Sequence, residues 1–101
     1  MGQRSRAELV IHEKLTSSSG LVREIRVWKM RKSGQYPQGI RYRLALVNCK
    51  SGELYLLYDN HWPKGPHVHF DGRETVYSFE SVVALLIDFR DRADAVERQV
   101  R

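Results

Sequence analysis

The sequence predicts a single α+β domain, in which about five antiparallel strands form hairpins and a C-terminal helix packs on one face of their sheet. Three observations predict this class. Short runs of alternating apolar and polar residues occupy the first two thirds of the chain, clusters of Ser, Gly and Pro separate these runs, and apolar residues then recur at helical spacing. A length of 101 residues suits one domain, which covers residues 1–101.

The first four strands are expected as two hairpins. Each hairpin consists of two runs of alternating apolar and polar side chains, separated by a short turn that contains Gly. A loop with Gly and Pro at residues 33–39 joins the two hairpins. The four runs are residues 8–16, 21–30, 41–49 and 53–59.

The chain is expected to end with a fifth strand and a helix. The strand covers residues 67–71, between a turn rich in Pro and Gly and the closing Gly72. The helix runs from about residue 79 to 97, with Ser78 as its N-cap and Glu80 in its first turn. Its apolar stripe, which packs on the sheet, consists of Val82, Leu85, Leu86, Phe89, Ala93 and Val96.

The net charge of +5 is concentrated in the N-terminal half of the chain. Residues 1–50 hold eleven Lys and Arg against three Glu, whereas residues 51–101 hold six against nine Asp and Glu. Such an asymmetric field attracts polyanions, above all nucleic acid, or an acidic protein. The alternative is the solvated surface of a basic protein. The candidate nucleic-acid-binding residues are Arg23, Arg26, Lys29, Arg31, Lys32, Arg41 and Arg43.

The composition also indicates a compartment. The single cysteine, Cys49, has no partner for an internal disulfide or a CxxC motif, and a lone thiol fits a reducing environment. The first residues lack the apolar segment of a signal peptide. No run approaches the ~20 apolar residues of a membrane span. We therefore expect a cytoplasmic protein that does not enter a membrane.

Three of the four histidines fall within nine residues, flanked by aspartates. His67 and His69 alternate on the expected strand, so their side chains share a face. If residues 62–66 form a hairpin loop, His61 lies opposite His67, and Asp59 lies opposite His69. All four side chains would then meet on one face of the sheet.

Three functions fit this segment. In the first, His67 and His69 are general acid and base in the cleavage of an RNA phosphodiester, because an imidazole with a pKa near ~6.5 both takes and gives protons near neutral pH. A basic side chain would stabilise the charged phosphorane, and a tyrosine would position it. The candidate catalytic residues are His67, His69, His61, Asp59, Lys64, Arg73 and Tyr58.

In the second function, three histidines with a carboxylate bind a divalent metal such as zinc, as three histidines and an open position do in catalytic zinc sites. The candidate ligands are His61, His67, His69 and Asp71. In the third, the histidines only hydrogen-bond the backbone of a rigid turn. The first and third functions need no cofactor.

The run from Tyr58 to Glu74, followed by Tyr77-Ser78-Phe79 and the apolar segment Leu85–Phe89, resembles the TumE-type toxin family of bacterial toxin–antitoxin systems. The shared pattern is a Tyr-Asp pair, a histidine-rich turn, an Asp-Gly step and a tyrosine before a helix. The likeness covers residues 54–92 and extends to the N-terminal half only in general layout. Related sequences often carry another histidine where Pro66 stands, so a role that needs that side chain cannot operate here.

The resemblance implies a toxin that acts on a cellular target, with RNA as the expected one, and a helix-turn-helix antitoxin that binds and neutralises it. The leading hypothesis is therefore a small ribonuclease that binds RNA on its basic face and cleaves it at the histidine segment. The alternative is a non-enzymatic protein that binds nucleic acid or an acidic partner. A homodimer joined through an exposed strand at residues 21–30 is a third hypothesis.

Overall fold

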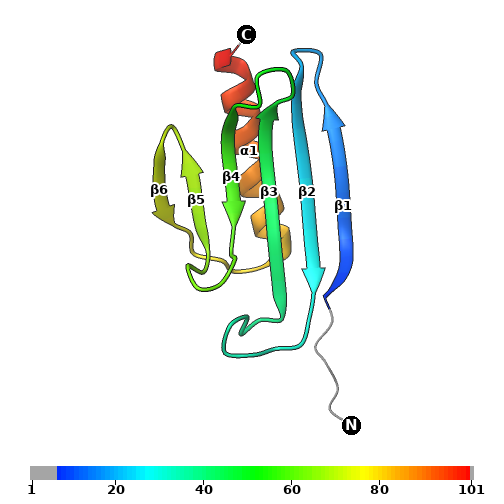
Figure 1. The fold of residues 1–101 in the computed structure, drawn as a ribbon, viewed down its shortest axis with the longest axis vertical. Coiled ribbons are helices and arrows are strands. Elements are labelled where there is room, and N and C mark those ends of the chain that lie inside the picture. The colour runs from blue at the N-terminus through cyan, green and yellow to red at the C-terminus, as the bar shows by residue number, and fades with distance from the viewer. Residues whose placement is uncertain (1–6, 101) are drawn as a thin grey trace.

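The computed structural model describes residues 7–100. They form a six-stranded antiparallel sheet in the order β1-β2-β3-β4-β5-β6, with one helix packed on it (Figure 1). The α+β class is confirmed, with one strand more than expected. No helix in the described range has the length and apolar character needed to cross a bilayer. The elements are β1 (Glu8–Thr16), β2 (Leu21–Lys29), β3 (Ile40–Asn48), β4 (Leu54–Asp59), β5 (His67–Phe70), β6 (Arg73–Val76) and α1 (Val82–Val100).

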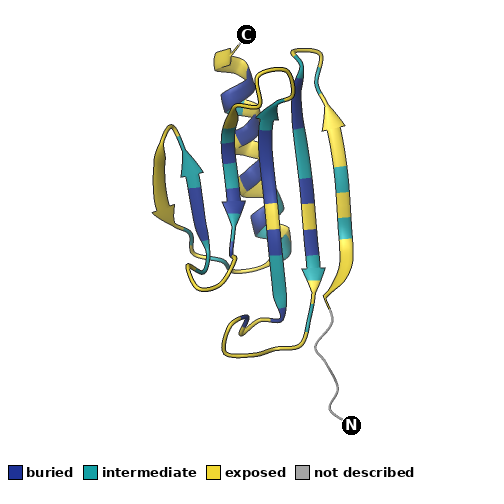
Figure 2. Ribbon diagram, in the orientation of Figure 1, coloured by how far each residue is buried: buried dark blue, intermediate teal, exposed yellow. Residues whose placement is uncertain are grey.

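The helix covers one face of the sheet, and the core lies between the two layers (Figure 2). On β2, Leu21, Ile25 and Val27 are buried in this core, which also contains Leu85 and Phe89 of α1. Burying one large apolar side chain contributes roughly 1.5–3 kcal/mol, so this interface stabilises the fold. No helix of the described chain covers the opposite face, which we call the open face (Figure 1).

The additional strand is β6. Asp71 and Gly72 adopt φ values of 54° and 73°, and two successive positive φ values give a two-residue turn whose twist matches that of a β-hairpin. Phe70 therefore pairs with Arg73, and the pairing continues along β6. The Asp-Gly step was expected to end the last strand, but it turns the chain back into a further one.

The helix begins later than predicted. The Ser81 hydroxyl accepts a hydrogen bond of 3.1 Å from a backbone amide in the first turn of α1, so Ser81 is the N-cap. The prediction of Ser78 as N-cap is wrong, and Glu80 precedes the helix. The preceding residues lead the chain from β6 back under the sheet, where the ring of Phe79 stacks on that of Tyr42 with centroids 5.4 Å apart.

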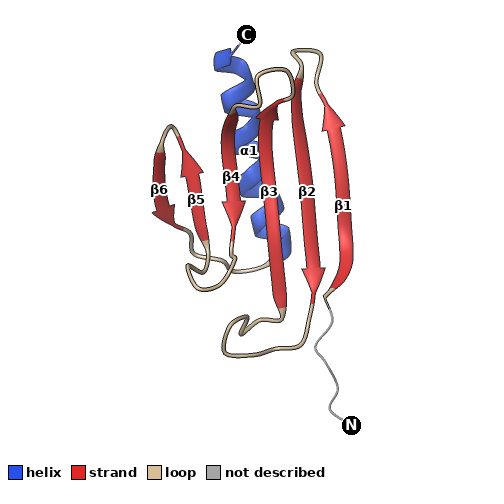
Figure 3. Cartoon of the chain, in the orientation of Figure 1, coloured by secondary structure: helices blue, strands red, loops and turns tan. Residues whose placement is uncertain are grey.

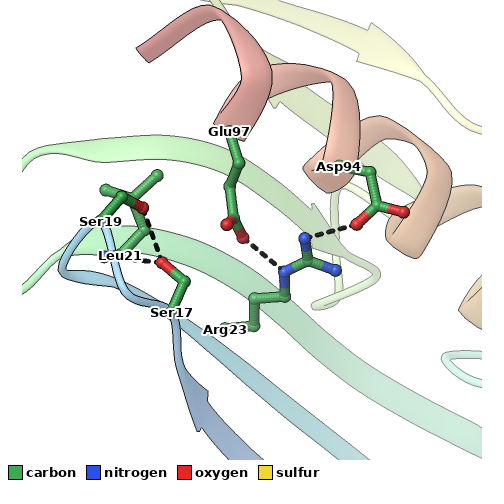
Figure 4. Close-up of polar contacts among 6 residues, drawn as sticks. All are labelled: Ser17, Ser19, Leu21, Arg23, Asp94 and Glu97. Atoms are coloured by element: carbon green, nitrogen blue, oxygen red, sulfur yellow. Dashed lines mark hydrogen bonds and ion pairs between the residues drawn. The ribbon is translucent and has the colours of Figure 1, made fainter. Parts of the chain in front are cut away.

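An ion-pair cluster connects β2 to the last turns of α1 (Figure 4). Arg23 Nε donates to Glu97 Oε2 at 2.7 Å, and Arg23 Nη2 donates to Asp94 Oδ1 at 2.6 Å. Burial alone would lower the pKa of Arg23, but the hydrogen bonds to Asp94 and Glu97 outweigh burial and raise it. Arg23 is therefore already neutralised within the fold.

Both edges of β2 are occupied, because it pairs with β1 on one side and with β3 on the other. The prediction that residues 21–30 form an exposed seam for a homodimer is therefore wrong. Among the described strands, β1 and β6 are the ones with a free edge.

Candidate functional site

A row of polar residues crosses the open face, toward the end of the sheet where the β2–β3 and β4–β5 loops lie together (Figure 3). Residues that face each other on paired strands lie on the same side of a sheet, and neighbouring strands are about 4.8 Å apart. Strand pairing therefore places one residue from each of five strands in a continuous line. From β1 to β5 the row is His12, Arg26, Arg43, Asp59 and His67.

Three of the predicted nucleic-acid-binding residues lie on this open face. Arg26 faces Arg43 directly, and the Arg41 guanidinium lies 5.1 Å from the ring centroid of Trp28. Arg26 forms an ion pair of 2.9 Å with Glu24, whereas Arg43 is exposed and pairs with no described residue. Like charges that face each other across two strands are destabilising, but acidic residues flank this pair, because Glu24 bonds Arg26 and Asp59 lies directly across from Arg43.

The other four predicted residues lie elsewhere. By strand alternation, Arg23 and Lys29 point to the side of the sheet that α1 occupies, and Arg23 is held there by acidic side chains. Arg31 and Lys32 are exposed in the β2–β3 loop. This loop lies at the same end of the sheet as the β4–β5 loop (Figure 3), so its charges add to the field there.

At the β5–β6 end of the open face, three side chains converge, and we call this group the histidine cluster: His67, His69 and Glu74. One nitrogen or oxygen ligand atom from each residue lies within 4.8 Å of those of the other two. His69 Nε2 is 3.3 Å from Glu74 Oε1. The two imidazole rings meet edge to face, with centroids 5.0 Å apart. The cluster borders solvent, because the His69 and Glu74 side chains are 37% and 36% exposed.

Two contacts from the β4–β5 loop fix the cluster. His67 is buried, and its Nδ1 donates to the Gly65 carbonyl at 2.7 Å. Because a carbonyl can only accept, the neutral ring keeps its lone pair on Nε2. Lys64 Nζ donates to Glu74 Oε1 at 2.7 Å, and this hydrogen bond, together with the charges of Lys64, His69 and His67, lowers the pKa of Glu74.

The loop itself is held by buried polar contacts. Where β4 ends, the Asn60 side chain makes the hydrogen bonds to β3 that a strand backbone would otherwise make. Its Oδ1 accepts from the Tyr42 amide, and its Nδ2 donates to the Ile40 carbonyl, both at 2.8 Å. The Trp62 amide donates to the Tyr36 hydroxyl of the β2–β3 loop at 3.1 Å. The peptide bond between Trp62 and the following proline is cis. These contacts place Lys64 and Gly65 beside the cluster.

The register between β4 and β5 differs from the predicted one. Asp59 faces His67, and Leu57 faces His69, so the predicted pairings of His61 with His67 and of Asp59 with His69 are wrong. Strand β4 ends at Asp59, and its carboxylate accepts a hydrogen bond of 2.6 Å from the His61 backbone amide. The His61 residue is exposed in the loop and lies outside the cluster.

Three other candidates also lie outside the cluster. Tyr58 is buried in the core, where its ring meets those of Tyr77 and Phe89, so it is on the face opposite the histidines. Arg73 lies by alternation on that same covered side. Asp71 belongs to the β5–β6 turn.

The sequence interpretation missed Glu74. It faces His69 directly across β5 and β6, so recognising the Asp-Gly hairpin would have identified it. Two histidines and one carboxylate around a solvent-exposed position can exchange protons with a substrate or bind a metal ion.

No known protein family, curated protein or solved structure matches this chain.

Proposed function

We propose that this protein binds RNA across the open face and cleaves it at the histidine cluster, as the toxin of a toxin–antitoxin system. The observation that carries the proposal is that Arg26, Arg43 and His67 lie in one row of the same uncovered sheet face. Arg43 and His67 are two strands apart, which is about 10 Å. A polyanion that contacts the arginines would reach the histidines.

The open face has the side chains that single-stranded RNA requires. Exposed arginines contact phosphates, and an aromatic ring such as Trp28 offers a stacking surface. Arg26 and Arg43 face each other on adjacent strands, so a phosphate bound between them would offset the repulsion of these like charges. This arrangement favours an anionic ligand over a surface that is merely solvated.

The cluster has the groups that phosphodiester cleavage requires. Two imidazoles of fixed orientation can take and give protons or hold a metal ion. The Lys64 ammonium, 2.7 Å from Glu74, can stabilise the charge that develops on the phosphorane. In this proposal Lys64, His67 and His69 are the catalytic residues of the cluster, whether the imidazoles transfer protons or hold a metal ion.

The toxin role rests on the resemblance of residues 54–92 to TumE-type toxins. It implies a helix-turn-helix antitoxin as partner and a cytoplasmic site of action. The non-enzymatic alternative, an RNA-binding or acidic-protein-binding domain, would use the same arginines without the histidines.

The test measures RNA binding and RNA cleavage separately with the purified chain. Arg26→Gln/Arg43→Gln should weaken binding to single-stranded RNA and reduce the slope of log affinity against log salt by about 1.4, because two phosphate contacts are lost. The charge-matched control Lys50→Gln/Arg98→Gln removes two exposed cations away from the open face and should leave the slope unchanged. Equal slopes in all three proteins would refute binding at the open face.

Cleavage is followed on total RNA, with His69→Ala as the test variant because its partly exposed side chain can be removed without opening the core. We expect cleavage by the wild type and none by His69→Ala, with RNA binding retained. If neither protein cleaves RNA while the arginine variant loses binding, the non-enzymatic alternative is correct.

A further inference from the structure

We propose that His67, His69 and Glu74 form a binding site for one divalent metal ion of the zinc class. The proposal deepens the proposed function, since it names the cofactor of the same cluster, but the metal site itself does not depend on RNA cleavage. It replaces the ligand set predicted from the sequence, because His61 and Asp71 lie outside the cluster.

The spacing of the three side chains suits a tetrahedral ion. Zinc binds imidazole nitrogen and carboxylate oxygen at about 2.0–2.2 Å, which places two tetrahedral ligand atoms roughly 3.3–3.6 Å apart. His69 Nε2 and Glu74 Oε1 are already 3.3 Å apart. One ligand atom of each of the three residues lies within 4.8 Å of the others, so rotamer adjustments of about 1 Å close the site.

The surroundings of His67 are those of a metal ligand. A histidine that binds a metal through one nitrogen almost always donates its other N–H to a carbonyl or carboxylate, which fixes the ring. His67 donates from Nδ1 to the Gly65 carbonyl at 2.7 Å, and its burial fixes the ring further. Nε2 is thereby left as the atom available for coordination.

The Lys64 ammonium already binds at the Glu74 carboxylate, so this part of the cluster attracts a cation. The ammonium lies 2.7 Å from Glu74 Oε1, the oxygen that also contacts His69. Since the Lys64 side chain is 58% exposed on a loop, it can move into solvent when a metal ion replaces it. Lys64 and a metal ion should therefore compete for Glu74.

The donor set selects the class of ion. Two imidazoles and one carboxylate suit Zn²⁺ and similar transition metals, whereas Ca²⁺ and Mg²⁺ prefer oxygen ligands alone. Three protein ligands at a solvent-exposed position leave a fourth place for water, as in catalytic zinc sites. In the proposed cleavage, that water loses a proton to solvent and its hydroxide bonds to phosphorus. The bond from phosphorus to the 5′ oxygen then breaks, and this oxygen takes a proton from water.

The experiment titrates the chelator-treated full chain with ZnCl₂ in a calorimeter, with MgCl₂ as the second probe. We expect one zinc per chain and no magnesium binding at the same concentrations. His69→Ala should abolish zinc binding, Glu74→Gln should weaken it at least tenfold, and Lys64→Ala should strengthen it several-fold. Circular dichroism checks that each variant is folded.

The control is His61→Ala, which removes an exposed histidine of the same hairpin and should leave zinc affinity unchanged. Absence of zinc binding, or equal affinity in wild type and Glu74→Gln, would overturn the proposal, and loss of binding in His61→Ala would restore the ligand set predicted from the sequence. Zinc binding without RNA cleavage would leave the metal site and refute the ribonuclease function. RNA cleavage that persists in EDTA, with no zinc binding, would refute the metal site and support the ribonuclease function.

Discussion

Asn60 is the residue whose loss should most directly weaken the attachment of the β4–β5 loop to β3. It is 8% exposed, and its amide satisfies two backbone groups of β3, the Tyr42 N–H and the Ile40 carbonyl. Asn60→Ala leaves both groups without a partner beside the core. A buried backbone group that loses its hydrogen bond costs about 1–3 kcal/mol, so we expect a loss of roughly 2–4 kcal/mol in the free energy of unfolding.

Urea unfolding followed by circular dichroism measures this loss. With a slope of about 1.5 kcal/mol per molar urea, the midpoint should fall by roughly 1–3 M. The matched control is Asn48→Ala. Asn48 Oδ1 also accepts two backbone hydrogen bonds, from Lys50 and Ser51, but it does so in an exposed turn where water can replace it. Its loss should cost about 1 kcal/mol or less, and equal midpoints for the two variants would refute the reasoning.

Two further predictions concern the frame of the sheet. Gly39→Ala should destabilise the fold by at least about 1–2 kcal/mol, because Gly39 has φ +68° and an added Cβ would lie 2.6 Å from the Met30 carbonyl oxygen. Both variants are compared in a thermal melt, where Gly34→Ala, whose Cβ would meet nothing within 4 Å, should be neutral, and a neutral Gly39→Ala would contradict this. The pKa of Glu24 lies below its ordinary value of 4.5 because it accepts a hydrogen bond from His12, so its stabilising effect is present above pH 4.5 and is lost as the pH falls through the lower folded-state pKa. The urea midpoints of wild type and Glu24→Gln should therefore differ above pH 4.5 and converge below it, and a constant difference would contradict the assignment.

Local sequence patterns predicted most of the sheet. On β2, the apolar residues Ile25 and Val27 alternate with Glu24 and Arg26, and the structure buries the first pair and turns the second to the open face. Strand β6 was missed because its residues are exposed and mostly polar, so hydrophobic alternation gave no signal. Its only local signal was the Asp-Gly turn.

The start of the helix could not be predicted from capping propensity alone. Ser78 and Ser81 are equally good N-caps by residue type. The choice depends on tertiary structure, because the chain must first return from the edge of the sheet and place Phe79 on Tyr42. The side-chain bond of Ser81 to the first turn follows from that path.

Strand alternation also predicted part of the candidate site. His67 and His69 share a face, as a two-residue spacing on a strand requires. His61 was placed wrongly because Asn60 takes over the hydrogen bonds of β3 where β4 ends, which shortens the strand and lengthens the loop. Glu74 was missed together with β6. The first error comes from side-chain contacts between segments distant in the sequence, and the second from a local turn whose following strand is exposed and mostly polar.

Because side chains alternate between the two faces of a strand, the position of each cation along β2 decides whether it points toward α1 or toward the open face. Residues 21, 25 and 27 are buried beneath α1, so Arg23, of the same parity, must also point toward the helix, where Asp94 and Glu97 neutralise it. Arg26 has the opposite parity and faces Arg43 on a surface that no described helix covers. The open face thus carries the exposed Arg26 and Arg43 together with the acidic Glu24 and Asp59, in and beside the row that ends at His67. The proposed anionic ligand depends on this separation of the cations between the two sides of the sheet.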